Sequence, residues 1–541
     1  MITHEILKSL PAGVQAPPYD INGIKPGIVH FGVGNFFRAH EAFYVEQILK
    51  DDPNWGIIGV GLTGSDRSKK KAEEFKKQDC LFSLTETAPS GKSTVRVMGA
   101  LRDYLLAPAD PEAVLKHLAD PAIRIVSMTI TEGGYNINET TGEFDLQNKA
   151  VQQDLKTPET PSTIFGYVVE GLRRRRDAGG KAFTIMSCDN LRHNGNVARK
   201  AFLGYAKARD PELAKWIEEN ATFPNGMVDR ITPTVSAAIA KKLNDASGLN
   251  DDLPLVAEDF HQWVLEDNFA DGRPALEKAG VQFVEDVTDY EHVKIRMLNA
   301  GHIMLCFPGV LAGYENVDQA LADADLRRNL ENFLNKDVIP TLEAPPGMTL
   351  EGYRDSVISR FSNPAMADQT LRISGDGSSK IQVFWTETVR QALEGKRDLS
   401  RIAFGMASYL EMLRGKDEKG DTYEPFEPTF DESQKILAKA DDFESALKLP
   451  AFDAWRDLDT SELNSKVVAL RKIIREKSVK AALPAGINLL CHGKGRRLIR
   501  EAAFFVGDDA QLRLRGWVFL VRLKDVQEGV GGLAAVAFLM P

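Results

Sequence analysis

Apolar and polar positions in the first part of the chain alternate between short apolar runs and longer amphipathic segments. This alternation is typical of βα units and predicts a mainly parallel sheet covered by helices. The expected buried strands are Gly27–Phe31, Trp55–Leu62, Ile123–Thr131 and Ala182–Cys188, and the expected helices are Phe36–Lys50 and Ser162–Arg175. Several of these strands end in polar residues, so we expect the chemistry to lie at one edge of the sheet.

Two further patterns predict an inserted hairpin and a helical second part. Apolar runs on both sides of a Ser90-Gly91 turn predict an inserted β-hairpin, Phe82–Thr85 with Ser93–Val97. Beyond about Tyr290, apolar residues recur at helical spacing and few β-branched runs remain. The helices expected there are Val293–Val310, Asn316–Leu334, Ser379–Leu393 and Ile402–Leu413.

A glycine turn follows the first predicted strand. Gly32 and Gly34 open the next helix, where glycines let the backbone approach a pyrophosphate. Phe37 stands where the usual pattern has its third glycine, and an ordinary strand–helix turn is the alternative interpretation. The cofactor contacts expected around this turn are Gly32, Gly34, Phe36 and Arg38.

We therefore predict an α/β fold in two parts. A Rossmann-type dinucleotide-binding N-terminal domain, residues 1–285, precedes a mostly α-helical C-terminal domain, residues 286–482. Residues 483–541 form a C-terminal appendage of unknown role, in which Leu512–Leu523 alternates like a strand.

The second strand of such a domain ends near the cofactor's adenosine ribose. Asp66 is the first carboxylate after Leu62 and is expected to bind the ribose hydroxyls, although Gly64 to Asp66 is also good turn chemistry. Arg67 and the lysines at 69–71 follow closely and are suited to a 2′-phosphate instead. On the position of Asp66 we expect NAD rather than NADP.

The candidate catalytic residues lie in one run, Lys294-x4-Asn299-x2-His302. In an α-helix they fall at about 0°, 140° and 80°, so a broad helical face presents all three. A lysine can remove a hydroxyl proton if burial and nearby cations lower its pKa, and Asn299 can donate to the developing oxyanion. The alternative is an exposed lysine and a hydrogen-bonded core histidine.

Two rival active sites fit less well. Tyr290-x3-Lys294 matches the Tyr–Lys pair of short-chain dehydrogenases, but it lies about 260 residues after the glycine turn, too far for a single-domain enzyme. A zinc alcohol dehydrogenase needs clustered Cys and His ligands, and only His193 lies near Cys188 in sequence. We therefore expect no metal.

Overall charge and hydropathy narrow the partners. A formal net charge of −10 argues against nucleic-acid binding, which needs a concentrated positive surface. We expect neither a signal peptide nor a run of roughly 20 apolar residues that spans a bilayer. The expectation is a cytoplasmic protein with a small-molecule substrate and no nucleic-acid or membrane partner. Its oligomeric state stays open, with a monomer favoured.

Four ordered motifs carry a family resemblance: Gly32–His40, Thr131–Tyr135, Ser187–Asn190 and the Lys294 run. From about Gly27 to about Ala482 the chain resembles the long-chain mannitol dehydrogenase family. The resemblance implies a metal-independent, reversible oxidation of D-mannitol at C2 to D-fructose with NAD. The family also contains arabinitol dehydrogenases and hexuronate reductases that share the lysine run, so the run indicates the chemistry better than the substrate.

The same resemblance implies residue roles. Lys294 becomes the general base, Asn190 and Asn299 form an oxyanion hole, and His302 contacts the substrate. The other implied positions are Glu132 beside the nicotinamide, with Asp229, Arg372 and Lys380 as polyol contacts. We expect Arg372 and Lys380 to lower the pKa of Lys294.

Three hypotheses about function follow. The first is mannitol oxidation. The second is a related activity, either an arabinitol dehydrogenase or a fructuronate or tagaturonate reductase in which Arg372 or Lys380 binds a carboxylate. The third is an NAD-binding regulatory protein without turnover, against which the intact Lys294, Asn299 and His302 argue.

Overall fold

The computed structural model describes residues 1–138 and 141–488. The expected strand at Leu512–Leu523 lies outside the described residues. Among those described, no helix is long and apolar enough to cross a membrane.

The central sheet of the first part has five parallel strands in the order β6-β3-β2-β7-β8. Their bounds are β2 (Pro26–Phe31), β3 (Gly56–Gly61), β6 (Leu101–Leu106), β7 (Ile125–Met128) and β8 (Thr184–Ser187). Counted from β2, this is the order 3-2-1-4-5 of a Rossmann-type sheet. The four predicted strands are confirmed within a few residues. The hydrophobic pattern does not predict β6, because four of its six side chains are only partly buried.

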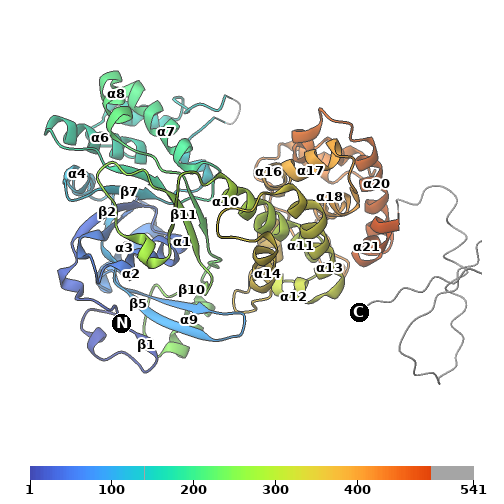
Figure 1. The fold of residues 1–541 in the computed structure, drawn as a ribbon, viewed down its shortest axis with the longest axis horizontal. Coiled ribbons are helices and arrows are strands. Elements are labelled where there is room, and N and C mark those ends of the chain that lie inside the picture. Colours follow the sequence, from blue (N-terminus) through green and yellow to red (C-terminus); the bar gives the residue numbers. More distant parts are fainter. Residues whose placement is uncertain (139–140, 489–541) are drawn as a thin grey trace, which may run out of the picture. The chain divides into compact units, whose positions relative to one another are not determined.

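Helices cover both faces of this sheet (Figure 1). One face shares an apolar core with α4 (Pro111–Ala119), α6 (Ile164–Asp177), α7 (Asn194–Arg209) and α8 (Pro211–Asn220). The other face packs on α1 (Asn35–Ala39), α2 (Glu41–Ile48) and α3 (Asp66–Lys77). The predicted helix Phe36–Lys50 is therefore two helices. They break at His40, whose φ of −121° and ψ of −86° are not helical and whose ring contacts the carbonyl of Gln262.

Two small sheets complete the first part. The predicted hairpin is confirmed as β4 (Phe82–Thr87) and β5 (Ser93–Met98), flanked by β1 (Val14–Gln15) and β10 (Leu255–Glu258). The other sheet, β12-β11-β9, was not predicted; it comprises β9 (Gly226–Asp229), β11 (Gln262–Glu266) and β12 (Gln282–Val284). Two short helices also belong here, α5 (Lys149–Lys156) and α9 (Ala237–Ser247).

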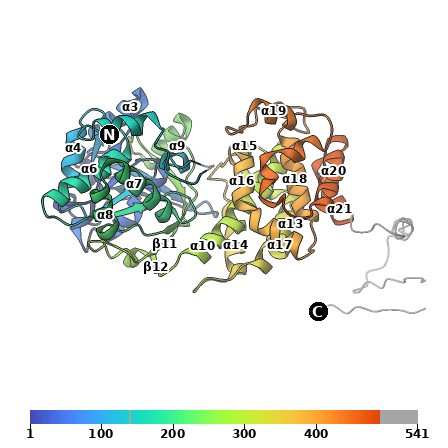
Figure 2. The same cartoon turned by 90° about the horizontal axis from the view of Figure 1, so that it is seen from above.

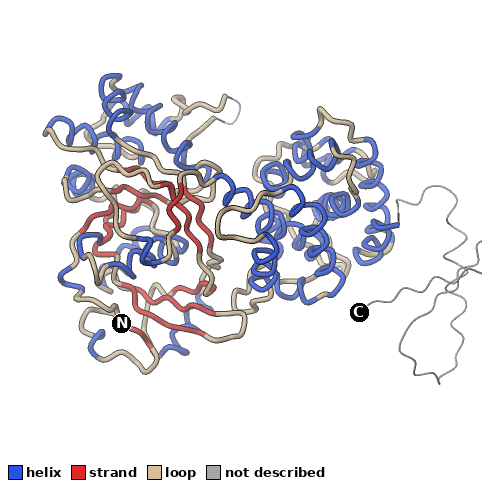
Figure 3. Tube along the Cα trace, viewed as in Figure 1, coloured by secondary structure: helices blue, strands red, loops and turns tan. Residues whose placement is uncertain are grey.

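The later part is helical over its described residues, as Figure 3 shows. Its first helices are α10 (Thr288–Val293), α11 (Ala300–Leu311), α12 (Val317–Ala322), α13 (Ala324–Phe333) and α14 (Leu350–Phe361). They are followed by α15 (Thr370–Ser374), α16 (Gly377–Phe384), α17 (Thr386–Glu394), α18 (Ser400–Met412), α19 (Glu432–Ala438), α20 (Ser461–Glu476) and α21 (Val479–Asn488). Every residue of α11 is buried. This helix packs against α12, α13 and α18, which Figure 1 labels with it, and against α15, which Figure 2 labels. The predicted fold class is confirmed.

Candidate active site

A cavity of about 780 Å³ lies at the carboxyl ends of β2, β3 and β7. Its lining includes Gly32, Gly34, Thr131 and Gly133. At Gly32 φ is +90°, and a Cβ would lie 2.0 Å from the carbonyl oxygen of Thr129, so the turn requires glycine there. At Gly34 a Cβ would meet no protein atom closer than 3.8 Å, which leaves its space free for a ligand. The cavity therefore fits a dinucleotide held against a glycine turn.

The structure separates the predicted cofactor residues into two groups. Gly32 and Gly34 line the cavity, whereas Phe36, Arg38 and Asp66 do not. Phe36 stacks on His40, and the buried guanidinium of Arg38 donates 2.7 Å to the carbonyl of Leu253. Arg38 therefore holds the glycine turn through its contact with Leu253 and does not line the cavity.

The far end of the cavity, after β3, is cationic. Asp66 is fully exposed and lies 3.6 Å from Lys69, while Arg67, Ser68 and Lys71 line the cavity. Burial, together with Arg38 and Arg67, lowers the pKa of Lys71 to about 8, and its ammonium donates to the carbonyl of Val33. Among the described residues, no carboxylate lines this cavity.

The predicted helix Val293–Val310 is confirmed as α10 and α11 with a π-helical turn, Lys294–Asn299, between them. The amide of Ala300 bonds to the carbonyl of Ile295, five residues back. Residues five apart are joined by one turn of π-helix, so Lys294 and Asn299 lie one above the other. The α-helical angle of about 140° is wrong for this pair. Arg296, buried, donates to Thr388 at 3.2 Å and fixes the turn to α17.

Lys294 contacts Asn190, which the family resemblance places in the same active site. The Lys294 side chain is 6 % exposed, and its ammonium donates to Oδ1 of Asn190, which follows β8. The pKa of Lys294 is lowered to about 8, chiefly by burial and also by Arg360, while Asp229, Glu132 and Glu291 oppose the shift. A base of this kind is available near neutral pH.

The cation that acts on Lys294 is Arg360 of α14, rather than the expected Arg372 and Lys380. Arg360 is buried and forms two hydrogen bonds of 2.8 Å to the carboxylate of Asp229, with a further contact of 2.7 Å to Glu258. Burial raises the pKa of Asp229, but Arg360, Lys294 and Tyr353 together outweigh this, so the pKa is lowered. Asp229, expected to contact polyol, is thus already held in an ion pair beside Lys294.

Asn299 and His302 present unused polar atoms. Oδ1 of Asn299 and Nε2 of His302 are buried and have no hydrogen-bond partner among the described residues. His302 stacks on Phe361 of α14 with ring centroids 3.9 Å apart. Burial and the nearby Arg360, Arg372 and Lys380 lower the pKa of His302 to about 3, so its ring is neutral. Buried polar atoms without partners indicate a place where a ligand binds.

The two expected cations are themselves paired. Arg372 is half-exposed and forms an ion pair with Asp368, four residues earlier. Lys380 donates 2.8 Å to the carbonyl of Ile373. Both lie close enough to act on the pKa of His302, as stated above, and neither is among the groups that act most on Lys294.

Sequence reasoning missed Glu291, one helical turn before Lys294. Glu291, Asn190 and Lys294 together line a small cavity. The amide of His193 donates 3.0 Å to a carboxylate oxygen of Glu291. Burial raises the pKa of Glu291 to about 7. The predicted Glu132 is exposed and also acts on the pKa of Lys294.

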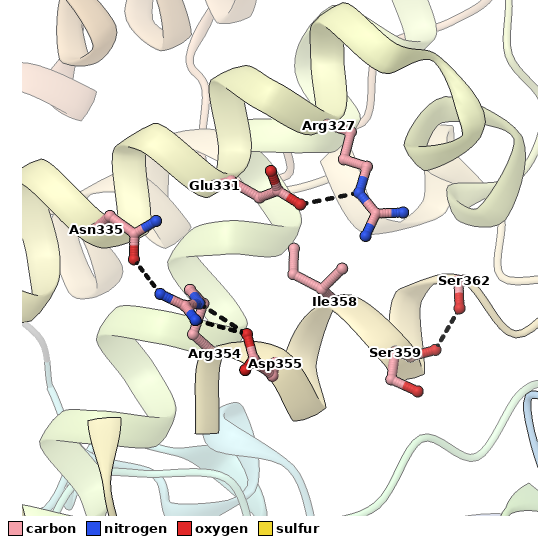
Figure 4. Close-up of a pocket in the computed structure, with 8 residues that line it drawn as sticks. All are labelled: Arg327, Glu331, Asn335, Arg354, Asp355, Ile358, Ser359 and Ser362. Carbon is pink, nitrogen blue, oxygen red and sulfur yellow. Dashed lines mark hydrogen bonds and ion pairs between the residues drawn. The ribbon is translucent and has the colours of Figure 1, made fainter. Parts of the chain in front are cut away.

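A separate open cavity of about 490 Å³ lies between α13 and α14 (Figure 4). Its cations already have partners: Arg327 contacts Glu331 at 2.9 Å, and Arg354 contacts Asp355 at 2.8 Å. None of the predicted site residues lines it.

A Rossmann-type sheet, a glycine turn and a buried lysine opposite the sheet edge define the class as a dinucleotide-dependent oxidoreductase. Residues 26–278 match the family model described as the mannitol dehydrogenase Rossmann domain, and residues 286–474 match the mannitol dehydrogenase C-terminal domain. The chain therefore belongs to the mannitol dehydrogenase family of polyol oxidoreductases, which confirms the predicted family.

Similar proteins include a polyol:NADP oxidoreductase of Gluconobacter oxydans, 86 % identical over 485 residues that cover 90 % of this chain and 100 % of that protein. A solved structure of a D-sorbitol dehydrogenase in substrate-free form is 84 % identical, with a TM-score of 0.85 and coverage of 90 % and 100 %. The Pseudomonas fluorescens mannitol 2-dehydrogenase, solved with NAD and D-mannitol, is 38 % identical, with a TM-score of 0.81 and coverage of 90 % and 99 %.

Proposed function

We propose that this protein oxidises a secondary hydroxyl of a hexitol to a ketone, with D-sorbitol and D-mannitol as the first substrates to test. The observation that carries the proposal is Lys294, buried, bound to Asn190 and lowered in pKa to about 8, beside the unpartnered polar atoms of Asn299 and His302. The names of the similar polyol, D-sorbitol and mannitol enzymes support it.

In the proposed reaction, Lys294 in its neutral form removes the proton of the substrate hydroxyl. Because Asn190 binds Lys294 through Oδ1, its Nδ2 is left to donate to the oxygen as negative charge develops. Asn299 lies one π-turn above Lys294, and its Nδ2 donates to the same oxygen. Nε2 of the neutral His302 accepts from a neighbouring hydroxyl of the polyol. A bound nicotinamide dinucleotide supplies the hydride acceptor.

For the cofactor we propose NADP in preference to the NAD expected from Asp66. The support is the cavity wall after β3, where Arg67, Ser68 and Lys71 face the space and Asp66 does not. The guanidinium of Arg67 and the hydroxyl of Ser68 suit a 2′-phosphate, whereas a ribose diol is usually bound by a carboxylate. NAD stays the alternative, since the P. fluorescens relative was solved with it.

For the substrate class we propose a neutral polyol rather than a sugar acid. Arg372 is neutralised by Asp368, and Lys380 is held by a backbone carbonyl, so neither presents a free cation to a carboxylate. Removing the partner in Asp368→Asn frees Arg372, and we expect it to raise kcat/KM for fructuronate relative to fructose by roughly tenfold, the worth of one charge-assisted contact.

The deciding assay measures NADP and NAD reduction with D-sorbitol, D-mannitol and D-arabinitol. We expect wild type to use NADP with at least about tenfold higher kcat/KM, and Arg67→Ala to lose most of that preference. Lys70→Ala is the matched control, because Lys70 is on the same helix but does not line the cavity. Faster NAD reduction would overturn the cofactor proposal, and no turnover of any polyol with either cofactor would overturn the function.

A further inference from the structure

Thr131 has a backbone conformation that only glycine adopts readily. Its φ is +64° and its ψ is +167°, and it is β-branched. Side chains are strained in this region of φ and ψ, and such residues persist only where their surroundings hold them. Thr131 precedes the short 3₁₀ helix Glu132–Tyr135, and Thr131, Gly133 and Gly134 all line the dinucleotide cavity.

One carboxylate holds this segment. Asp189 accepts from the amide of Thr131 at 2.9 Å and from the amide of Ile130 at 3.0 Å. The hydroxyl of Tyr135, at the other end of the segment, donates to the same carboxylate at 2.7 Å. Asp189 is 8 % exposed, so little water competes for these bonds.

Asp189 is also the chain neighbour of Asn190, the partner of Lys294. Its own backbone is fixed, because Nδ2 of Asn194 donates 3.0 Å to its carbonyl. A single residue therefore joins the wall of the dinucleotide cavity to the residue that binds the lysine.

We propose that Asp189 is a positioning residue of the reaction, which holds Thr131 in its strained conformation and so keeps residues 130–135 against the dinucleotide, in register with Asn190 and Lys294. The expected effect on kcat rests on the proposed function, whereas the expected effect on dinucleotide binding rests on the cavity alone. The aspartate serves because two carboxylate oxygens accept three donors, whereas an asparagine offers one oxygen and turns an NH₂ group toward an amide or hydroxyl donor.

The test is a double-mutant cycle between Asp189→Asn and Thr131→Gly. If Asp189 acts by holding Thr131, a glycine that needs no holding makes the loss of Asp189 less costly, so the two effects are not additive. We expect Asp189→Asn alone to raise the Kd for NADPH and lower kcat by at least about tenfold, and the same change made in the Thr131→Gly protein to cost less than about threefold.

The Kd is read from quenching of protein fluorescence by NADPH and NADH, and kcat and KM from polyol oxidation. Asp251→Asn is the matched control: Asp251 is a buried carboxylate away from the cavity that accepts from Ser83 and Gln78. Thr131→Gly should not reduce its effect. Equal costs of Asp189→Asn in both backgrounds would overturn the inference. If wild type binds NADPH but oxidises no polyol, the proposed function fails while the binding cycle still tests Asp189.

A second measurement covers the case in which Asp189→Asn does not fold. Thr131→Gly and Thr131→Ala both remove the threonine side chain, but only glycine relieves a positive φ. We expect the glycine variant to unfold at a higher temperature than the alanine variant. Equal unfolding temperatures, or a lower one for glycine, would contradict strain at this position and the inference with it.

Discussion

Replacing Lys294 with methionine removes an ammonium group from a buried position and leaves an unbranched side chain in its place. Burial is the main reason that the pKa of Lys294 falls from 10.5 to about 8. Because the charged ammonium is buried, it lowers the stability of the folded state. We therefore expect Lys294→Met to stabilise the protein at neutral pH while it removes most polyol oxidation.

The size of the effect follows from the two pKa values. The fall is about 2.5 units, and at 1.36 kcal/mol per unit the protonated lysine costs the folded state about 3 kcal/mol. Below pH 8 both states bind the proton and the cost is complete. Between pH 8 and 10.5 the unfolded state binds more protons, so the wild type gains stability with pH, and at pH 10 the cost is about 1 kcal/mol.

The assay is urea unfolding of wild type and Lys294→Met at pH 7 and pH 10, without dinucleotide. The free energy of unfolding of Lys294→Met should exceed that of wild type by about 2 kcal/mol less at pH 10 than at pH 7. Lys207→Met, on the exposed side of α7, controls for the loss of a lysine and should show no such change. An advantage that is the same at both pH values would refute the reasoning, because it would come from packing and not from charge.

The same pKa predicts the kinetics of the wild type. Oxidation needs the neutral amine, so its rate should rise with pH through about 8, and ketone reduction, which needs the ammonium, should fall over the same range. Loss of the base in Lys294→Met should lower kcat about 10²- to 10⁴-fold. A variant that keeps most of its kcat at every pH would remove Lys294 from this role.

Two further predictions concern the cofactor turn and the ion pair behind the lysine. Gly32→Ala should lose more than about 1 kcal/mol in urea unfolding, because φ is +90° and a Cβ would clash with Thr129, whereas Gly34→Ala should keep its stability and weaken NADPH binding. Unchanged NADPH binding by Gly34→Ala would contradict the cavity as the dinucleotide site. Arg360→Met should cost about 3–5 kcal/mol, since it leaves two buried carboxylates unpaired, and a loss no larger than that of the surface variant Arg390→Met would argue against the pair.

Much of the fold follows from local pattern. The buried strands β2, β3, β7 and β8 are short apolar runs bounded by polar residues, and such runs can be found without knowing what packs on them. The sheet β12-β11-β9 was missed because its strands pair across long stretches of chain and β12 has no fully buried side chain. The break of the first helix at His40 depends on a contact with Gln262, which no local pattern contains.

The candidate site divides in the same way. The meeting of Lys294 with Asn190 is implied by the family resemblance, which places both residues in one active site. The cation beside Lys294 is not, since Arg360 and its partner Asp229 are separated by 131 positions and nothing in the sequence of α14 marks an arginine as buried. Asp66 lies after β3 as expected, but its side chain is exposed because α3 begins there, and the sequence pattern does not predict this exposure.

The π-helical turn has a consequence for the length of the chain at this point. A π-turn is a helix carrying one residue more than an α-helical turn needs. If the same residues wound instead as an uninterrupted α-helix, all of α11 would rotate by about 100° relative to α10. His302 would then leave Phe361, and Asn299 would leave its place above the lysine. At this point the helix gives up regular α-helical hydrogen bonds and keeps three side chains aligned, and a related sequence with one residue fewer here would keep the same alignment in a regular α-helix.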